Sequence, residues 1–370
     1  MIKKHLTFIT ILINSLFIFA MENNFSKESW QYLMNAEREF DKKNYSLSMR
    51  LAQDAVSKRI EESETNFTIL TNAITPYQVR KVGDNINDVL DILNERQEYD
   101  AIKIINFYTT KMGYEYFSSS IKKLSEYISN YREYPEAYFL IAKIYHIEGE
   151  FDMALTYLEK ARANSFLLEI PQNENDILFL MSEIAEYKKD IPMQEKALIL
   201  IAKNSGDFQN EILKKAIIRT SKSTKDDNSS RFFKLYRVDA VSCVNSYNKL
   251  SHIYLDSKKY EDAYLTSAYS VLICFTHLNS LLEERESDYV YSDLKGFFRE
   301  LARYPDMMKW CNDVKFWESF YNLCDIGLKC GYTRFPKDII KSLSEFCPEN
   351  YWKLAASKRL KELNSLSENQ

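Results

Sequence analysis

Glycine and proline are scarce in this sequence, with 7 residues of each in a chain of 370. β-Sandwiches, barrels and phosphate-binding loops need glycine at positive-φ positions and in tight turns, so this scarcity argues against all three. The net charge of −4 gives no electrostatic footprint for nucleic acid, which requires a clustered basic face. Hydrophobic residues make up 45% of the chain, too many for a disordered protein. Helices joined by short turns remain as the predicted architecture.

The short motifs that mark catalytic, cofactor and metal sites are also missing. GxSxG, HExxH, Walker-type, GxGxxG and EF-hand patterns are absent. His146 with Glu150, and His252 with Asp256, have helical i,i+4 spacing, for which an exposed surface pair is the simpler interpretation. We therefore predict no enzyme activity, no cofactor and no metal. An enzyme with its site in 280–360 is the weaker alternative, since that region has no histidine and no nucleophile–base motif.

The first 20 residues have the composition of an export signal. Lys3 and Lys4 precede an apolar run from Leu6 to Ala20. As a helix this run would cover roughly 22 Å, short of the roughly 30 Å hydrocarbon core of a membrane. Residues 1–20 are therefore predicted to be a signal peptide that is cut after Ala20, which places the protein in the periplasm or cell envelope. The alternative is an uncleaved inner-membrane anchor formed by residues 6–20.

A pattern of small and bulky residues begins at Pro135. Its members are Tyr138, Ile141, Ala142, Tyr145, Gly149, Phe151, Ala154, Leu158 and Ala161. The pattern resembles the tetratricopeptide repeat (TPR), in which two antiparallel helices interlock. Small residues allow the backbones to approach closely, and large residues fill the adjoining grooves. The resemblance implies an all-α fold in which helical hairpins stack into a solenoid with a right-handed superhelical twist.

Four further segments carry the same pattern less completely, starting at Ser29, Ala101, Asn175 and Val244. The Ala101 unit precedes the Pro135 unit by 34 residues, which is the period of the family. The predicted organisation is a signal peptide (1–20), a degenerate N-terminal unit with a linker (21–100), a central TPR array (101–215), a polar linker (216–231), a TPR-like hairpin (232–279) and a helical C-terminal cap (280–370).

The resemblance also implies a binding groove, because the first helices of successive TPR units line a concave surface. Carried onto this sequence, the groove positions are Phe139, Lys143 and His146, then Phe179, Glu183 and Tyr187, and also Ile105, Thr109 and Met112. Aromatic side chains mixed with charges of both signs suit an extended peptide or a partner helix. The carboxylate clamp of chaperone-binding TPR proteins is not reproduced, since Phe139 and Lys143 occupy its positions. The alternative is that the protein's own next helix fills the groove.

We therefore predict a non-catalytic interaction module or assembly scaffold of the cell envelope, with a protein or peptide partner and no nucleic acid. A ligand-binding subunit of a transport system on a helical repeat scaffold is the alternative. The 26 Tyr and 22 Phe would allow stacking on a ligand, but many of them fall at core positions of the repeats.

All six cysteines lie in the second half of the chain, and none forms a CxxC pair. Cys243 and Cys274 are equally far from the expected turn at Lys258–Lys259, so they are the disulfide candidate in an oxidising compartment. Such a bridge would contribute on the order of 3–4 kcal/mol in the chain-entropy model. The alternative is a pair of buried free thiols. Spacing leaves open how Cys311, Cys324, Cys330 and Cys347 would pair.

Overall fold

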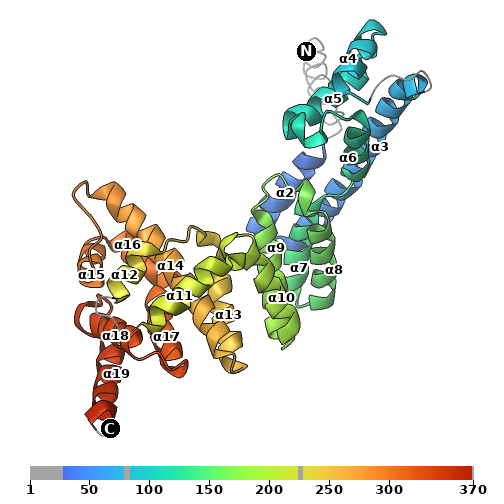
Figure 1. The fold of residues 1–370 in the computed structure, drawn as a ribbon. Coiled ribbons are helices and arrows are strands. Elements are labelled where there is room, and N and C mark those ends of the chain that lie inside the picture. The colour runs from blue at the N-terminus through green and yellow to red at the C-terminus, as the bar shows by residue number, and fades with distance from the viewer. Residues whose placement is uncertain (1–27, 79–83, 224–227, 369–370) are drawn as a thin grey trace, which may run out of the picture. The chain divides into compact units, whose positions relative to one another are not determined.

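The computed structural model of the chain describes residues 28–78, 84–223 and 228–368, which fold into two compact units. Unit 1 extends to Ile177 and unit 2 begins at Leu178. The described residues are mainly helical and contain no strand, only an isolated bridge between Asn85 and Ser120 (Figure 1). The prediction of an all-α, TPR-like fold is confirmed. The predicted signal peptide, residues 1–20, lies outside the described residues.

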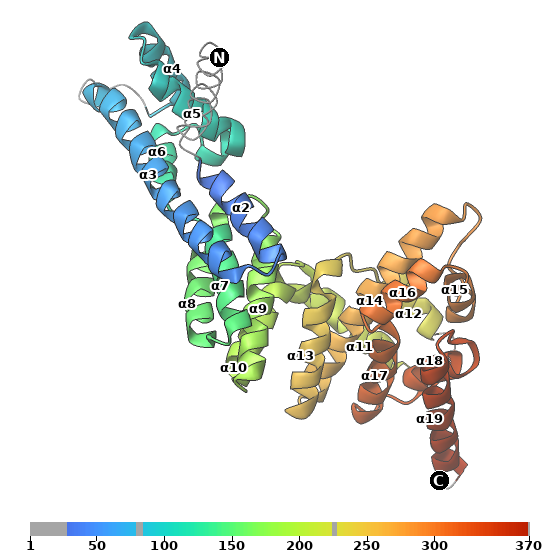
Figure 2. The ribbon, with the colours of Figure 1, turned by 180° about the vertical axis from the view of Figure 1, so that it is seen from behind.

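Two helical hairpins form the repeat-like part of unit 1. They consist of α2 (Ser29–Asp41) with α3 (Tyr45–Gln78), and of α7 (Pro135–Glu148) with α8 (Phe151–Ala163), which lie side by side in Figures 1 and 2. Pro135 occupies the first turn of α7, where its missing N–H costs no helical hydrogen bond. Gly149 ends α7 with φ 81°, a left-handed conformation that glycine adopts without a steric penalty. These signals set the bounds of the second hairpin.

Alanine residues allow the two hairpins to pack closely. Helix α7 packs on α3 and α2 in one apolar cluster that includes Ala36, Ala52, Ala55, Ala137, Leu140 and Ile141. The four alanines of this cluster are fully buried. Ala142, Ala154 and Ala161 are also 0% exposed, so the predicted interlocking of paired helices is present in the structure. A larger side chain at these positions would push the helices apart, so the alanines allow the observed helix spacing.

A separate apolar cluster surrounds the second half of α3. The helix runs for 34 residues, and no glycine or proline interrupts it before Pro76 in its last turn. Its C-terminal half packs on α5 (Tyr99–Met112) and α6 (Ile121–Asn130), and α5 packs in turn on α4 (Ile86–Glu95). The core of this region includes Leu70, Ile86, Leu93, Ile105, Tyr108 and Leu124.

The order of the repeats in unit 1 differs from the predicted order. The 34-residue spacing predicts that the Ala101 unit stacks directly before the Pro135 unit. Instead, α7 packs on the hairpin that starts at Ser29, and α5 and α6 pack on α3. Two residues of the Ala101 pattern show why: Phe107 is 55% exposed, and Phe117 lies in a short 3-10 helix, Glu115–Phe117. The segment between α3 and α7 therefore does not stack between the two hairpins, although its spacing matches the repeat period.

Helix α14 (Tyr260–Arg285) forms the centre of unit 2. It pairs with α13 (Val244–Asp256), which packs on α10 (Ile191–Lys203). Among the described helices, α14 alone is long and apolar enough to cross a membrane, but 78% of its most apolar stretch is buried inside the protein. Its apolar character is therefore that of a core helix. The hairpin predicted from Val244 has its turn at Ser257–Lys259, close to the predicted place.

The remaining helices of unit 2 pack around α14, either directly or through one another. They are α11 (Glu211–Lys222), α12 (Asn228–Leu235), α15 (Leu294–Leu301), α16 (Pro305–Asp313), α17 (Phe316–Lys329), α18 (Arg334–Phe346) and α19 (Asn350–Glu368). The polar linker predicted at 216–231 is wrong over most of its length, because α11 and α12 occupy it. Ser221 is buried and accepts a hydrogen bond of 2.5 Å from the hydroxyl of Tyr264. Helix α9 (Asn173–Tyr187) contains the boundary between the units.

Enlarging one of the interlocking alanines tests this packing. We expect Ala161→Leu to lower the free energy of unfolding by about 1–3 kcal/mol, because the added carbons have no space at a fully buried position. Ala163→Leu is the matched control, since Ala163 lies on the same helix and is exposed. Urea unfolding followed by circular dichroism measures both. Equal stability of the two variants would contradict the interlocking.

Candidate functional site

Helices α2 and α7 share a partly exposed face on which aromatic and charged side chains meet. The ammonium group of Lys143 lies 4.8 Å from the ring centroid of Phe139 on the same helix. It also lies 5.1 Å from the ring centroid of Phe40 on α2. Both distances are within the range of cation–π attraction. The ammonium group of Lys143 thus lies close to two aromatic rings from neighbouring helices. We call the surface formed by Phe40, Phe139 and Lys143 the α2–α7 face.

Acidic side chains complete the α2–α7 face. Burial lowers the pKa of Lys143, and the negative charges of Glu37, Asp176 and Asp41 act against that effect. Burial also raises the pKa of the Glu37 carboxyl, although the positive charge of Lys143 opposes the change. The face therefore combines apolar rings with a partly desolvated cation and nearby anions. Such a surface offers a partner both apolar contact and charge complementarity.

The C-terminal end of α7 continues this face. His146 is half-buried, and its ring lies 5.7 Å from that of Phe151 at the start of α8. The adjacent Ile147 is 48% exposed. Phe139, Lys143 and His146 follow helical i,i+4 and i+3 spacing, so one side of α7 carries all three. The structure therefore brings together the first three predicted groove residues.

The second predicted set lies on α9 in unit 2. Phe179 is half-buried, Glu183 is exposed and Tyr187 is 72% exposed. Their spacing of four residues puts them on one side of the helix. Their place in a common groove with Phe139 and Lys143 stays a prediction.

The third predicted set does not form a surface. Ile105 is 0% exposed, and Thr109 is 3% exposed and donates a hydrogen bond of 2.8 Å to the carbonyl of Ile105. Met112 is half-buried and packs against the same apolar cluster. The assignment of these residues to the groove is wrong because α5 turns this side toward the core around α3. The error follows from the misplaced Ala101 unit.

Sequence reasoning missed the contribution of α2, although a signal for it was present. Glu37 stands eight residues after Ser29, as Lys143 stands eight residues after Pro135. Phe40 occupies the place in the Ser29 unit that His146 occupies in the Pro135 unit. Carrying the groove positions onto the Ser29 unit would have identified both residues.

The predicted disulfide between Cys243 and Cys274 is absent from the structure, where all six cysteines are free. The thiol of Cys243 donates to the carbonyl of Ile201 at 3.3 Å, so it faces α10. Cys274 is fully buried in the middle of α14. Burial raises the pKa of the thiol of Cys243, which makes it a poor nucleophile. Equal sequence distance from the turn did not bring the two sulphur atoms together, because the two residues face different neighbours.

Alkylation of the thiols checks this assignment. For protein isolated from its native compartment without reductant, we expect six alkylated cysteines after denaturation. In the folded protein, Cys330 should react before the others, because it is half-buried while the other five are buried. Its burial raises its thiol pKa to about 11, so even this reaction should be slow at neutral pH. Intact mass measures both stages, and fewer than six modifications in denaturant would show that a bridge exists.

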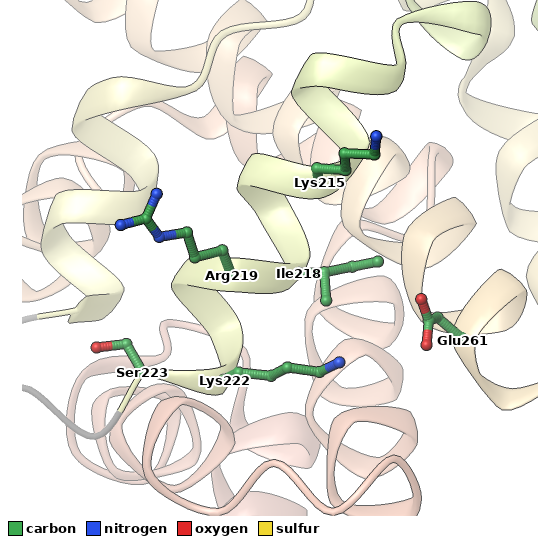
Figure 3. Close-up of a pocket in the computed structure, with 6 residues that line it drawn as sticks. All are labelled: Lys215, Ile218, Arg219, Lys222, Ser223 and Glu261. Atoms are coloured by element: carbon green, nitrogen blue, oxygen red, sulfur yellow. The ribbon is translucent and has the colours of Figure 1, made fainter.

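A hollow with charged residues lies on unit 2, between α11 and the start of α14, and has a volume of about 460 Å³. Figure 3 shows Lys215, Ile218 and Lys222 extending from α11 toward the side where Glu261 lies, while Arg219 points the opposite way. None of the predicted groove residues lines it. Among the described residues, no group of three or more His, Cys, Asp or Glu side chains is placed to hold a metal ion.

Comparison with known proteins is consistent with the geometry of α7 and α8. Residues 135–161 match the tetratricopeptide repeat family, and this segment covers most of that hairpin. The chain is similar to an uncharacterized protein of Treponema pallidum (strain Nichols), with 25% identity over 347 residues, which cover 91% of this chain and 93% of the relative. It is also similar to an uncharacterized protein of Borreliella burgdorferi, with 21% identity over 234 residues, covering 55% of this chain and 69% of the relative. The repeat match and the helical hairpins support a TPR-type protein.

Proposed function

We propose that this chain is a non-catalytic protein-interaction module that binds a partner peptide or helix on the α2–α7 face. The observation that carries the proposal is the grouping of Phe40, Phe139 and Lys143 on two adjacent repeat helices. The tetratricopeptide match at 135–161 supports the same function class, because such repeats generally mediate contacts between proteins.

The chemistry of the face favours a partner segment with both apolar and charged side chains. Aromatic anchors that are surrounded by polar groups are typical centres of binding energy in interfaces. The cation of Lys143 and the anions Glu37 and Asp41 would select a partner with complementary charges. Charges at an interface contribute mainly to specificity and to the rate of association. Binding should therefore weaken as the salt concentration rises.

The proposal includes export to the cell envelope, where the module would serve as a scaffold for assembly. Its support is the sequence of residues 1–20, in which Lys3 and Lys4 precede the apolar run that ends at Ala20. Within this proposal the partner is another protein of the envelope.

A paired substitution tests the binding face. Protein carrying Phe40→Ala and Phe139→Ala should lose the partners that wild-type protein captures from an envelope extract, because both half-buried rings would be removed from the α2–α7 face. Ile212→Ala is the control, because Ile212 is 84% exposed on α11 and lies outside the predicted groove. Quantitative mass spectrometry compares the captured proteins, and circular dichroism verifies that each variant is folded. Unchanged partners with the double variant would rule out the α2–α7 face as the binding surface.

Fractionation tests export. We expect the protein in the envelope or periplasmic fraction, with a mature N-terminus at Met21. The N-terminal peptide is identified by mass spectrometry. An intact N-terminus in the membrane fraction would support the uncleaved anchor, and an intact N-terminus in the cytosol would contradict export.

A further inference from the structure

A large hollow in unit 1 lies apart from the α2–α7 face and shares no lining residue with it. Its volume is about 1170 Å³, somewhat larger than the roughly 300–1,000 Å³ that is usual for small-molecule sites. The start of α2, the middle of α3 and one side of α5 form its walls, together with Tyr131 after α6 and Glu169. All of these belong to a single compact unit.

Arg59 on α3 is a buried cation that lines the hollow. Its side chain is 5% exposed, and its Nε atom is buried without a hydrogen-bond partner. The guanidinium carbon lies 4.2 Å from the ring centroid of Tyr131 and 3.9 Å from that of Tyr134. Burial acts to lower the pKa of Arg59, but these two tyrosines outweigh it and raise that pKa. The group is therefore a fixed cation whose buried N–H donor is unsatisfied, which is a costly state for a protein interior.

The acidic side chains of the hollow already have partners. Glu61 pairs with Lys58 at 2.9 Å, and Glu169 pairs with Lys111 at the same distance. Glu62 accepts hydrogen bonds from the backbone N–H and the hydroxyl of Ser29, at 2.8 and 2.6 Å.

Arg59 differs from these groups. Among the described residues that line the hollow, it is the cation for which no carboxylate lies within ion-pair distance. The positive charge of Arg59 acts on the carboxyl of half-buried Glu136, but that carboxyl accepts a hydrogen bond from the backbone N–H of Glu169 at 2.7 Å.

Apolar side chains form another part of the lining. Trp30 is 49% exposed and Phe107 is 55% exposed, and Ile104 lies one helical turn before Tyr108 on α5. The indole N–H of Trp30 donates to a carboxylate oxygen of Glu28 at 2.6 Å, which orients its ring. A ligand that enters the hollow would cover exposed aromatic surface, and this contributes favourably at roughly 25 cal/mol per Å² of apolar area.

We propose that this hollow binds a small organic acid, with one carboxylate group on an apolar body. The carboxylate accepts hydrogen bonds from the guanidinium of Arg59, whose planar donors match its two oxygens. The apolar body packs against Trp30 and Phe107. A phosphate dianion fits less well, because the carboxylates of Glu28, Glu61, Glu62 and Glu169 also line the hollow and repel a second negative charge.

Octanoate and 1-octanol are the matched probes, since they share an apolar chain and differ in the carboxylate. Calorimetric titration of the full-length protein should give an affinity for octanoate at least about tenfold higher than for octanol, because a hydrogen bond to a charged group is worth this much or more. Equal affinities for the two probes would overturn the proposal. So would a free-carboxylate hydrophobic tripeptide that binds tenfold tighter than octanoate, since the occupant would then be a peptide end.

Two variants locate the binding within the hollow. Arg59→Lys keeps the charge but loses the planar donors, so it should remove most of the preference for octanoate over octanol. Phe107→Ala removes a ring that is 55% exposed, and it should weaken the binding of both probes by a similar factor of several-fold. Ile212→Ala on α11 is the control and should bind both as wild type does. Thermal unfolding confirms that each variant folds. If Phe107→Ala binds both probes like wild type, the site is elsewhere and the proposal fails.

Discussion

The close approach of α7 to α2 and α3 is the constraint on which unit 1 depends. Fully buried alanines allow these backbones to pack together, because a methyl group takes little space between the helices. The α2–α7 face exists because of this packing. Phe40 and Lys143 are more than a hundred residues apart in the chain, and they meet only because their helices are neighbours. The charge environment of Lys143 is likewise a product of the helix arrangement.

The sequence was most informative where the signals are local. Pro135, Gly149 and the alanines of α7 and α8 predicted that hairpin, because helix starts, helix ends and close crossings each require a particular residue type. Neighbour relations were harder to predict. The length of α3 depends on the absence of helix breakers over a long stretch. Helices α5 and α6 pack on its second half and do not join the stack of hairpins. A spacing of one repeat period cannot distinguish a repeat from an insertion of the same length.

The residues of the candidate site were also predicted where their signal is local and missed where it depends on neighbouring helices. Phe139 and Lys143 were predicted from their own repeat, whereas Glu37 was missed because the wrong unit was placed beside it. The predicted disulfide shows that equal distance from a turn does not bring two side chains together. The thiol of Cys243 donates a hydrogen bond to the carbonyl of Ile201, on a helix outside its own hairpin. Arg59 gave no sequence signal at all. Its significance lies in two tyrosine rings from beyond α6 and in an unsatisfied donor, which only the folded chain reveals.

The unbroken helix α3 has a consequence for how unit 1 unfolds. Its first half packs in the hairpin with α2, and its second half packs in the cluster with α5 and α6. Both apolar clusters therefore depend on the same helix. Nucleating a separate helix within this span would be costly, and losing helical structure in the middle would remove the support of both ends. Neither cluster is therefore an independent folding domain. Unit 1 should melt in one cooperative step, and a fragment cut within α3 should be degraded rather than persist.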